Sequence, residues 1–510
     1  MQSNVITYFE EGAAGIWPAK TAVVDGDINM TFAELRAQAR NAAVAIISMA
    51  DVVNQPVAVY LPKSAKTVVA NLGILYSGNI YTNLDVKSPP QRLANILANI
   101  CPRLVITTRD RLSEVLSAGI AKGSVLLIDE IATSTMATAT LDHRRSNLID
   151  TDPVCIINTS GSTGTPKGVA LSHRGTIDFM DWVFDTFTLD DQVVIGSLSP
   201  FYFDIYTLEL MLCLAKGATL VIIPEQLAIF PAKLVEFLTS QHVSFVFWVP
   251  TIMVNIANLG LLDKLVLPEL TTVFFAGEVF PTRQLNMWRK AWPAALFVNL
   301  YGPIEIHVDC TYHVIDGVLA DDAPLSIGIP CRNTDILILN ESNERCVVDE
   351  LGELCVRGSS LALGYWNDPE KTANAFVQNP LNNHYPELIY RTGDLAIRRV
   401  DGQIFLAGRK DYQIKHMGYR IELPEIEHQV LAIPGVANAC VLYDHPKKAI
   451  TLFYQPADDE VTVATIRQTL AQIFPKYMLP TVYHSIEKLP MNPNGKIDRN
   501  GLLRQLSVDA

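Results

Sequence analysis

The 510-residue chain is poor in charge and in cysteine for its length, and its net charge is negative. Charged residues make up 18% of the sequence, with 40 Lys and Arg against 53 Asp and Glu, a formal net charge of −13. Nucleic acids and anionic membranes attract basic surfaces, so neither is an expected partner. The eight cysteines form no Cys-x-x-Cys pair, which argues against a zinc site or a disulfide framework.

Long apolar runs are also missing, and the sequence predicts no secretory leader. The N-terminus shows no basic segment followed by an apolar one, as a signal peptide would. No uninterrupted apolar stretch reaches the roughly 18 residues that suggest a membrane span. The sequence therefore predicts a chain without a membrane span, located in the cytoplasm.

The apolar residues that are present form short runs separated by helical patterns. The chain is 49% hydrophobic, and at roughly 100–200 residues per domain its length predicts two to four domains. Val- and Ile-rich runs such as 56–61, 103–108 and 154–158 are typical of buried parallel strands in α/β layers. The predicted fold class is α/β, with a large N-terminal core of layered mixed and parallel sheets flanked by helices.

Near residue 400 the pattern changes. Asp401-Gly402 predicts a hairpin turn between two strand-like runs, and a segment dense in charge and glycine follows it. We expect residues 1–410 to form the N-terminal core, and residues 411–510 to form a small, mobile α+β domain.

A glycine-rich stretch, TSGSTGTPKG at 159–168, follows the strand-like run at 154–158. Its glycines let the backbone approach phosphate oxygens, its hydroxyls supply donors, and Lys167 supplies a cation. A P-loop is excluded because that motif needs Gly-Lys-Ser/Thr, whereas Lys167 lies between Pro166 and Gly168. A flexible polar linker is the alternative, although a linker has little need for this lysine.

Five further glycine-anchored motifs follow in order: FFAGEVFP (274–281), NLYGPIE (299–305), YRTGDL (390–395), GRKDYQIKHMGYRIELPEIE (408–427) and NPNGKIDR (492–499). With the first stretch, they resemble the acyl- and aminoacyl-adenylate-forming superfamily over roughly residues 8 to 505. That superfamily includes acyl-CoA synthetases, luciferases and the adenylation domains of nonribosomal peptide synthetases. The resemblance implies ATP and Mg²⁺ as cofactors and activation of a carboxylate as an acyl-adenylate.

The resemblance also implies which residues bind the nucleotide. The glycine-rich loop would cover the β- and γ-phosphates, Asn299 and Tyr301 would hold the adenine, and Asp394 would bind the ribose hydroxyls with Arg409 as a second contact. Because Gly-Pro follows Tyr301, we expect that residue on a loop. The predicted ATP and AMP site comprises Thr159, Ser160, Gly161, Thr163, Gly277, Glu278, Asn299, Tyr301, Gly302, Asp394 and Arg409.

Three residues match the catalytic positions of the superfamily, namely Lys167, Glu305 and Lys496. Glu305 matches the magnesium ligand, and a carboxylate oxygen suits that ion. Lys496 would bridge the substrate carboxylate and the adenylate oxygens, because a cation stabilises two anions that must approach each other. Ile304 departs from the family's Thr, and losing that hydroxyl donor would cost on the order of 1 kcal/mol.

The boundary between the two domains also contains a residue that matches a functional position of the superfamily. Asp411 matches the hinge about which the C-terminal domain rotates between an adenylation state and a thioester-forming state. Gly418 and Arg420 then belong to the loop that faces the active site in the second state.

Asp204 lies among apolar residues and discriminates between branches of the superfamily. A buried carboxylate needs a cation, and in the amino-acid-activating branch an aspartate here binds the α-ammonium group. An exposed aspartate at a helix N-terminus is the alternative. The predicted substrate pocket is lined by Asp204, Ile205, Leu208, Phe247, Phe274, Ala276, Leu300, Val308 and Asp309 and closed by Lys496.

This lining most resembles that of stand-alone prolyl-carrier-protein ligases, so L-proline or a similar small amino acid is the favoured substrate. Asp309 departs from that group, and it would accept a hydrogen bond from a hydroxyl or a second amine, or point away. Serine, glycine and D-alanine remain alternatives. No carrier-attachment motif occurs near the C-terminus, so we expect a separate phosphopantetheinyl carrier protein as the acceptor. An acyl- or aryl-CoA ligase and a non-catalytic binding module are the competing hypotheses.

Overall fold

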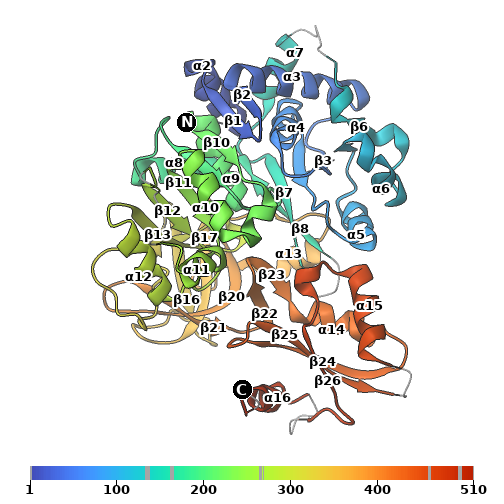
Figure 1. Cartoon of the computed structure of the whole chain (residues 1–510), viewed down its shortest axis with the longest axis vertical. Coiled ribbons are helices and arrows are strands. Elements are labelled where there is room, and N and C mark those ends of the chain that lie inside the picture. Colours follow the sequence, from blue (N-terminus) through green and yellow to red (C-terminus); the bar gives the residue numbers. More distant parts are fainter. Residues whose placement is uncertain are drawn as a thin grey trace.

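The computed structural model describes residues 3–132, 138–160, 166–262, 267, 269–457, 461–491 and 497–508. Its strands lie in layers covered by helices, with a smaller C-terminal part beside them (Figure 1). The α/β class with a large N-terminal core and a small C-terminal domain, as predicted from the sequence, is confirmed.

Two large sheets form the N-terminal core. Within the described residues, the first has nine strands in the order β15 (Ile329–Pro330), β14 (Thr311–Val314), β13 (Leu296–Tyr301), β12 (Thr272–Phe275), β11 (Phe245–Trp248), β9 (Val194–Ser197), β10 (Thr219–Ile222), β1 (Thr21–Asp25) and β2 (Ile28–Thr31). The second has seven in the order β18 (Gly364–Tyr365), β8 (Lys167–Ser172), β7 (Pro153–Thr159), β4 (Ile80–Asn83), β3 (Pro56–Val59), β5 (Leu104–Thr107) and β6 (Val125–Leu127).

Parallel pairing dominates the middle of both sheets, and antiparallel strands close their edges. Strands β9 to β13 pair in parallel, as do β3, β4, β5, β6 and β7. In contrast, β7 and β8 pair antiparallel, so the two ends of the glycine-rich stretch, Thr159 and Lys167, are partners across the ladder. Buried Val, Ile and Leu fill these central strands, which is the pattern that parallel sheets require.

A third sheet joins the core to the C-terminal part. It contains β16 (Thr334–Leu339), β17 (Gly352–Gly358), β19 (Phe376–Gln378), β20 (Leu388–Arg398) and β21 (Ile404–Arg409). Strands β20 and β21 pair antiparallel, which confirms the predicted hairpin at Asp401-Gly402.

Helices pack on both large sheets. In the N-terminal part they are α1 (Val5–Glu11), α2 (Ala13–Ile16), α3 (Phe32–Met49), α4 (Ala65–Tyr76), α5 (Pro90–Ile100), α6 (Leu112–Ser117), α7 (Thr138–Asn147), α8 (His173–Thr186), α9 (Ile205–Lys216), α10 (Pro231–Ser240), α11 (Pro250–Asn258), α12 (Thr282–Ala291) and α13 (Pro369–Ala375). Helix α9 starts at Asp204, whose side chain caps it, and stops at Gly217 in a left-handed conformation, as expected of helix termini.

The C-terminal part has its own core. A two-stranded hairpin, β22 (Gln413–His416) and β23 (Tyr419–Glu422), precedes a three-stranded sheet of β24 (Val436–Asp444), β25 (Ala449–Pro456) and β26 (Val482–Ser485), with α14 (Leu423–Leu431), α15 (Val463–Ile473) and α16 (Arg499–Val508). Its apolar cluster begins at Ile414. Asp411 lies between β21 and β22, where the chain leaves the third sheet for this part.

Candidate active site

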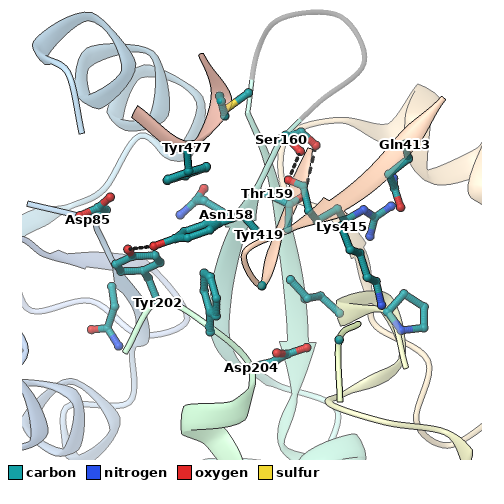
Figure 2. A pocket seen from close by; sticks show the side chains of 18 of the residues that line it. Asp85, Asn158, Thr159, Ser160, Tyr202, Asp204, Gln413, Lys415, Tyr419 and Tyr477 are labelled. Carbon is teal, nitrogen blue, oxygen red and sulfur yellow. Dashed lines mark hydrogen bonds between the residues drawn. The ribbon is translucent and has the colours of Figure 1, made fainter. Parts of the chain in front are cut away.

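A cavity lies where the β22–β23 hairpin meets the N-terminal core. Core residues that line it include Thr159, Ser160 and Asp204, and hairpin residues include Lys415, Tyr419 and Arg420. In Figure 2, Asp204 lies at the lower end of the cavity, Lys415 extends into it from the hairpin, and Tyr202, Tyr419 and Tyr477 stand on the opposite side. The site is therefore built by both parts of the chain.

Glu305 is the centre of a buried charge cluster in this site. Its side chain is fully buried, and its Oε1 accepts hydrogen bonds from Lys167 Nζ at 3.2 Å and Tyr365 Oη at 2.8 Å. Its Oε2 accepts from Arg420 Nη1 at 2.8 Å. Burial alone would raise the pKa of Glu305, but Arg420 and Lys167 hold that pKa below its ordinary value. The glutamate is therefore ionised and fully satisfied by cations and a phenol.

Glu305 can serve as the single carboxylate ligand of a bound Mg²⁺ ion. Among the described residues, no group of three or more His, Cys, Asp or Glu side chains is placed to hold a metal. Mg²⁺ needs only one or two carboxylates when phosphates supply the other oxygens, so Glu305 fits that role. Arg420 bonds the same carboxylate in this arrangement, so the metal and Arg420 compete for it.

Asp394 forms the second polar centre. Its Oδ2 accepts a hydrogen bond from Tyr301 Oη at 2.5 Å and its Oδ1 accepts one from Arg409 Nη1 at 2.7 Å. Arg409 also binds Asp411 through two bonds of 2.6 and 2.7 Å. The predicted ribose site and the predicted hinge residue are thus joined through one guanidinium group.

Tyr301 and Asn299 lie on a strand rather than on a loop. Tyr301 is the last residue of β13 and its ring is buried. The prediction that Tyr301 lies on a loop was wrong, because strand β13 continues up to the Gly302-Pro303 dipeptide. Asn299 Nδ2 donates to the Ser326 carbonyl at 2.8 Å. Neither residue lines the cavity described here.

Asp204 combines a helix cap with a place on the cavity wall. Its Oδ1 accepts a hydrogen bond from the Ile205 backbone N–H at 3.0 Å, and the side chain faces the cavity. Burial raises the pKa of Asp204 to about 6, against the lowering effects of that hydrogen bond and of Lys415. The alternative was an exposed aspartate at a helix N-terminus. Asp204 does lie at the N-terminus of α9, but it is not exposed.

The remaining residues of the predicted substrate pocket are buried together. One hydrophobic cluster contains the apolar members of the set, namely Ile205, Leu208, Phe247, Phe274, Ala276, Leu300 and Val308. The Phe247 and Phe274 rings meet edge-on with centroids 6.1 Å apart. Asp309 is only 2% exposed.

Glu278 connects the core to the hairpin. Its Oε2 accepts hydrogen bonds from Thr251 N and Oγ1, and its Oε1 accepts one from Gly418 N at 2.7 Å. Gly277 and Gly302 also line the cavity. Gly302 admits no side chain, since a Cβ there would lie 2.4 Å from the Asp309 Cα. The backbone at Gly302 therefore passes close to the backbone of Asp309, which a residue with a side chain would prevent.

The glycine-rich stretch is described only at its two ends. Ser160 Oγ donates to the Arg420 carbonyl at 2.6 Å, and Thr159 lines the cavity beside it. Gly161, Thr163 and Lys496 lie outside the described residues. Their roles stay predictions.

Several residues of the site were missed by the sequence analysis, and Lys415 and Tyr365 are two of them. Lys415 alternates with buried Ile414 along β22 and lines the cavity. Tyr365 binds Glu305, and Lys167 Nζ lies 4.6 Å from its ring centroid. Nothing local marks Tyr365, because strand pairing between β8 and β18 brings it there.

The described residues contain no helix that is long and apolar enough to cross a membrane. The eight cysteines are free thiols.

Comparison with known proteins gives the context of this site. The chain is 32% identical over 97% of its length to tyrocidine synthase 1 of Brevibacillus parabrevis, of which it covers 44%. It is 29% identical to the L-proline–[L-prolyl-carrier protein] ligase of Pseudomonas fluorescens, with 96% of the chain and 97% of that protein covered. The chain spans less than half the length of the tyrocidine synthases it matches.

Solved structures share the fold. One is a protein containing nonribosomal peptide synthetase adenylation and carrier domains, PA1221, with a TM-score of 0.85 at 23% identity, covering 99% of this chain and 84% of that one. Another is the Vibrio cholerae adenylation domain AlmE in complex with glycyl-adenosine-5'-phosphate, with a TM-score of 0.84 at 22% identity over 99% and 97% of the two chains.

Two family models match the sequence. Residues 10–366 match the AMP-binding enzyme model, and residues 425–496 match the AMP-binding enzyme C-terminal domain. The first match alone covers more than half of the 510 residues, and it includes Lys167, Asp204 and Glu305. The chain therefore belongs to the AMP-binding, adenylate-forming enzyme family.

Proposed function

We propose that this chain activates a small amino acid with ATP and transfers it to the phosphopantetheine thiol of a separate carrier protein. The observation that carries the proposal is Asp204, a carboxylate at the wall of a cavity that is also lined by Asp394 and by Arg420, the partner of Glu305. Asp204 supplies a counter-ion for an α-ammonium group, which a simple carboxylic acid lacks.

In the first half-reaction, an oxygen of the amino acid carboxylate attacks the α-phosphorus of ATP, and the bond to pyrophosphate breaks. The carboxylate is already ionised, so no general base is needed. Lys167 supplies positive charge beside the phosphates, and Lys496 is proposed to bridge the two reacting anions. Glu305 would hold Mg²⁺, which neutralises phosphate charge when it is bound.

In the second half-reaction, the carrier thiol attacks the aminoacyl carbonyl and AMP leaves. The arrangement described here supports this step, because Arg420 and the Gly418 backbone N–H face the core and bind Glu305 and Glu278. The cavity also continues from Asp204 past Tyr202 and Tyr419 to Tyr477. That continuation offers a path for an extended thiol arm.

We propose L-proline or a similar small amino acid as the substrate. Phe247 and Phe274 of the predicted substrate pocket are buried and their rings contact each other, and a relative of similar length is an L-proline–[L-prolyl-carrier protein] ligase. Serine, glycine and D-alanine are the next candidates, and an acyl- or aryl-CoA ligase is the alternative from another acceptor class.

Amino-acid-dependent ATP–pyrophosphate exchange tests the first half-reaction. We expect exchange with one or a few small amino acids and its loss in Asp204→Ala. Asp27→Ala, an exposed aspartate in the β1–β2 turn, is the matched control and should keep exchange. Exchange that depends on a simple acid and survives in Asp204→Ala would support the CoA ligase instead.

Loading of a radiolabelled amino acid onto a phosphopantetheinylated carrier protein, compared with formation of an aminoacyl-CoA, tests the acceptor. We expect the carrier protein to be the better acceptor. Preference for free coenzyme A would contradict this part of the proposal.

The proposed hinge at Asp411 adds a separate test. Its carboxylate is held by Arg409, which also binds Asp394, so rotation there is coupled to the ribose site. Asp411→Pro fixes φ and removes a backbone N–H. We expect slower thioester formation with pyrophosphate exchange retained, whereas equal loss of both activities would contradict the hinge.

A further inference from the structure

A surface groove lies beside the first sheet, and the proposed chemistry does not use it. It is lined by Phe187, which follows α8, by the first residues of β12 and β13, Thr272 and Leu296, and by Tyr312 of β14. The groove shares none of its described lining residues with the cavity at Asp204. The two hollows therefore lie at different places on the N-terminal core.

Two neighbouring strands lead from this groove to the predicted substrate pocket. Strands β12 and β13 pair in parallel, and every second residue of a strand faces the same side. The residues that share this side are Thr272, Phe274 and Ala276 along the first strand, and Leu296, Val298 and Leu300 along the second. In each set the first residue lines the groove, and the last belongs to the predicted substrate pocket. At roughly 3.3 Å per residue, about 13 Å of strand separates the two ends.

Two aromatic rings fill the space between the groove and the predicted pocket. Phe274 is fully buried, and its ring contacts that of Phe247, a predicted pocket residue, with centroids 6.1 Å apart. Phe187 packs against Phe274 with centroids 4.8 Å apart, and it is 5% exposed where it lines the groove. The order is therefore predicted pocket, Phe274, Phe187 and groove. We call these two rings the end wall.

The Phe187 ring is held in place from several sides. Its backbone N–H ends α8 by donating to the Val183 carbonyl at 2.9 Å. Its ring meets Trp182 and Tyr312 edge-on, with centroids 5.7 and 6.1 Å away. Because such neighbours close only part of the space when a large buried side chain is truncated, Phe187→Ala should leave an apolar hollow at the end wall.

We infer that Phe187 is a specificity-determining residue, which backs the Phe274 ring and limits the length of side chain that the enzyme accepts. The inference rests on the proposed function and deepens it, because it gives a structural reason for a substrate with a short side chain. A methylene group too many in a closed apolar pocket changes kcat/KM by about 10- to 200-fold. With the end wall opened, a longer apolar side chain extends into the groove instead.

Pyrophosphate exchange with side chains of increasing length tests the inference. The series extends the best wild-type substrate by one to six methylene groups, as 4-alkyl-L-prolines for proline or as 2-aminobutyrate to 2-aminooctanoate for an alanine-like substrate. We expect wild type to show a sharp cut-off in length. Phe274→Ala should move the cut-off to longer side chains but keep one, because Phe187 still closes the end.

The double variant Phe274→Ala with Phe187→Ala gives the decisive comparison. Its pocket opens into the groove, so the series should show no cut-off. We expect kcat/KM for the longest member to be at least tenfold higher than in Phe274→Ala alone. Phe274→Leu with Phe187→Val removes less volume and should shift the cut-off in the same direction, which keeps the test available if the first double variant folds poorly.

A matched truncation elsewhere separates an opened wall from a loosened core. Phe9 of α1 is fully buried against Phe32, with ring centroids 6.5 Å apart, and it touches neither hollow. Phe9→Ala should keep the wild-type cut-off. Calorimetric binding of aminoacyl-sulfamoyl-adenosine analogues with the shortest and the longest side chain should show the same length dependence without turnover.

The outcomes separate this inference from the proposed function. Amino-acid-dependent exchange with the same cut-off in Phe274→Ala and in the double variant would overturn the inference and leave amino acid activation standing. A cut-off that also disappears in Phe9→Ala would overturn it, because the core would then be responding as a whole. Absence of exchange with every amino acid in wild type would overturn both.

Discussion

Asp204 contributes a charge to the active site and lowers the stability of the folded protein when it is ionised. Its carboxyl lies at a half-buried cavity wall, and burial raises its pKa from 3.8 to about 6. A raised carboxyl pKa means that folding opposes ionisation. The stabilising contribution of the protonated form is complete below pH 3.8 and is lost as the pH rises through about 6. Above that pH the folded protein holds a charge that the unfolded chain holds more easily.

We therefore predict that Asp204→Asn stabilises the protein at pH 8. A difference of about 2 pKa units corresponds to about 3 kcal/mol at 1.36 kcal/mol per unit, and partial exposure reduces this to on the order of 1–3 kcal/mol. Asparagine keeps the helix-capping acceptor of α9. Chemical unfolding at pH 8 and pH 4 measures the effect.

The gain should shrink at pH 4, where the folded wild type is protonated at Asp204. A constant difference at both pH values would contradict the titration argument. The same logic predicts that the KM for the amino acid rises as the pH falls below about 6, while the KM for ATP changes less.

At the scale of elements, the β22–β23 hairpin is held against the core at its turn. Gly418 has a φ of 83°, its N–H donates to Glu278, and a Cβ there would lie 3.0 Å from a methyl group of Val249. We predict that Gly418→Val slows thioester formation at least tenfold and leaves pyrophosphate exchange within about twofold. Single-turnover transfer from a preformed aminoacyl-adenylate measures the first quantity.

Gly402 supplies a matched control for this experiment. It has the same φ of 83° in the turn between β20 and β21, but no atom lies within 4 Å of a Cβ built there. Gly402→Val imposes the same backbone strain without the contact. If it slows transfer as much as Gly418→Val, the effect comes from strain and the docking argument fails.

The same hairpin shows what the sequence can and cannot predict. The strand β7 and the hairpin at Asp401-Gly402 follow from local patterns, because short apolar runs and turn dipeptides determine them. The domain boundary near Asp411 stays a prediction. The bond between Arg420 and Glu305 depends on how two parts of the chain meet. No spacing within either motif specifies it. Tyr301 was assigned to a loop because Gly-Pro ends a strand without saying where that strand's last residue lies.

At the scale of the whole molecule, contacts between the two parts hold the arrangement described here. Arg92 in α5 bonds Glu425 in α14, with Nη1 and Oε1 3.2 Å apart and both side chains nearly buried. Tyr419 of the hairpin stacks on Tyr477, with ring centroids 3.5 Å apart, and its hydroxyl lies 3.4 Å from that of Tyr202. A rotation of the C-terminal part must separate Arg92 from Glu425.

We predict that Arg92→Met shifts the molecule away from this arrangement. Arg92→Met takes a cationic partner away from the buried Glu425 carboxylate, and breaking a buried ion pair costs about 3–5 kcal/mol. Each 1.4 kcal/mol changes a two-state population about tenfold. Rotation exposes Glu425 to water and relieves that cost, so the variant should favour the rotated state. Transfer to the carrier should slow while pyrophosphate exchange is retained, and fluorescence energy transfer between labels on the two parts should report the shift.

In Arg92→Met combined with Glu425→Met both charges of this pair are removed, so the original distance and transfer rate should largely return. If the double variant is no better than Arg92→Met, the contact matters through its shape and not through its charge.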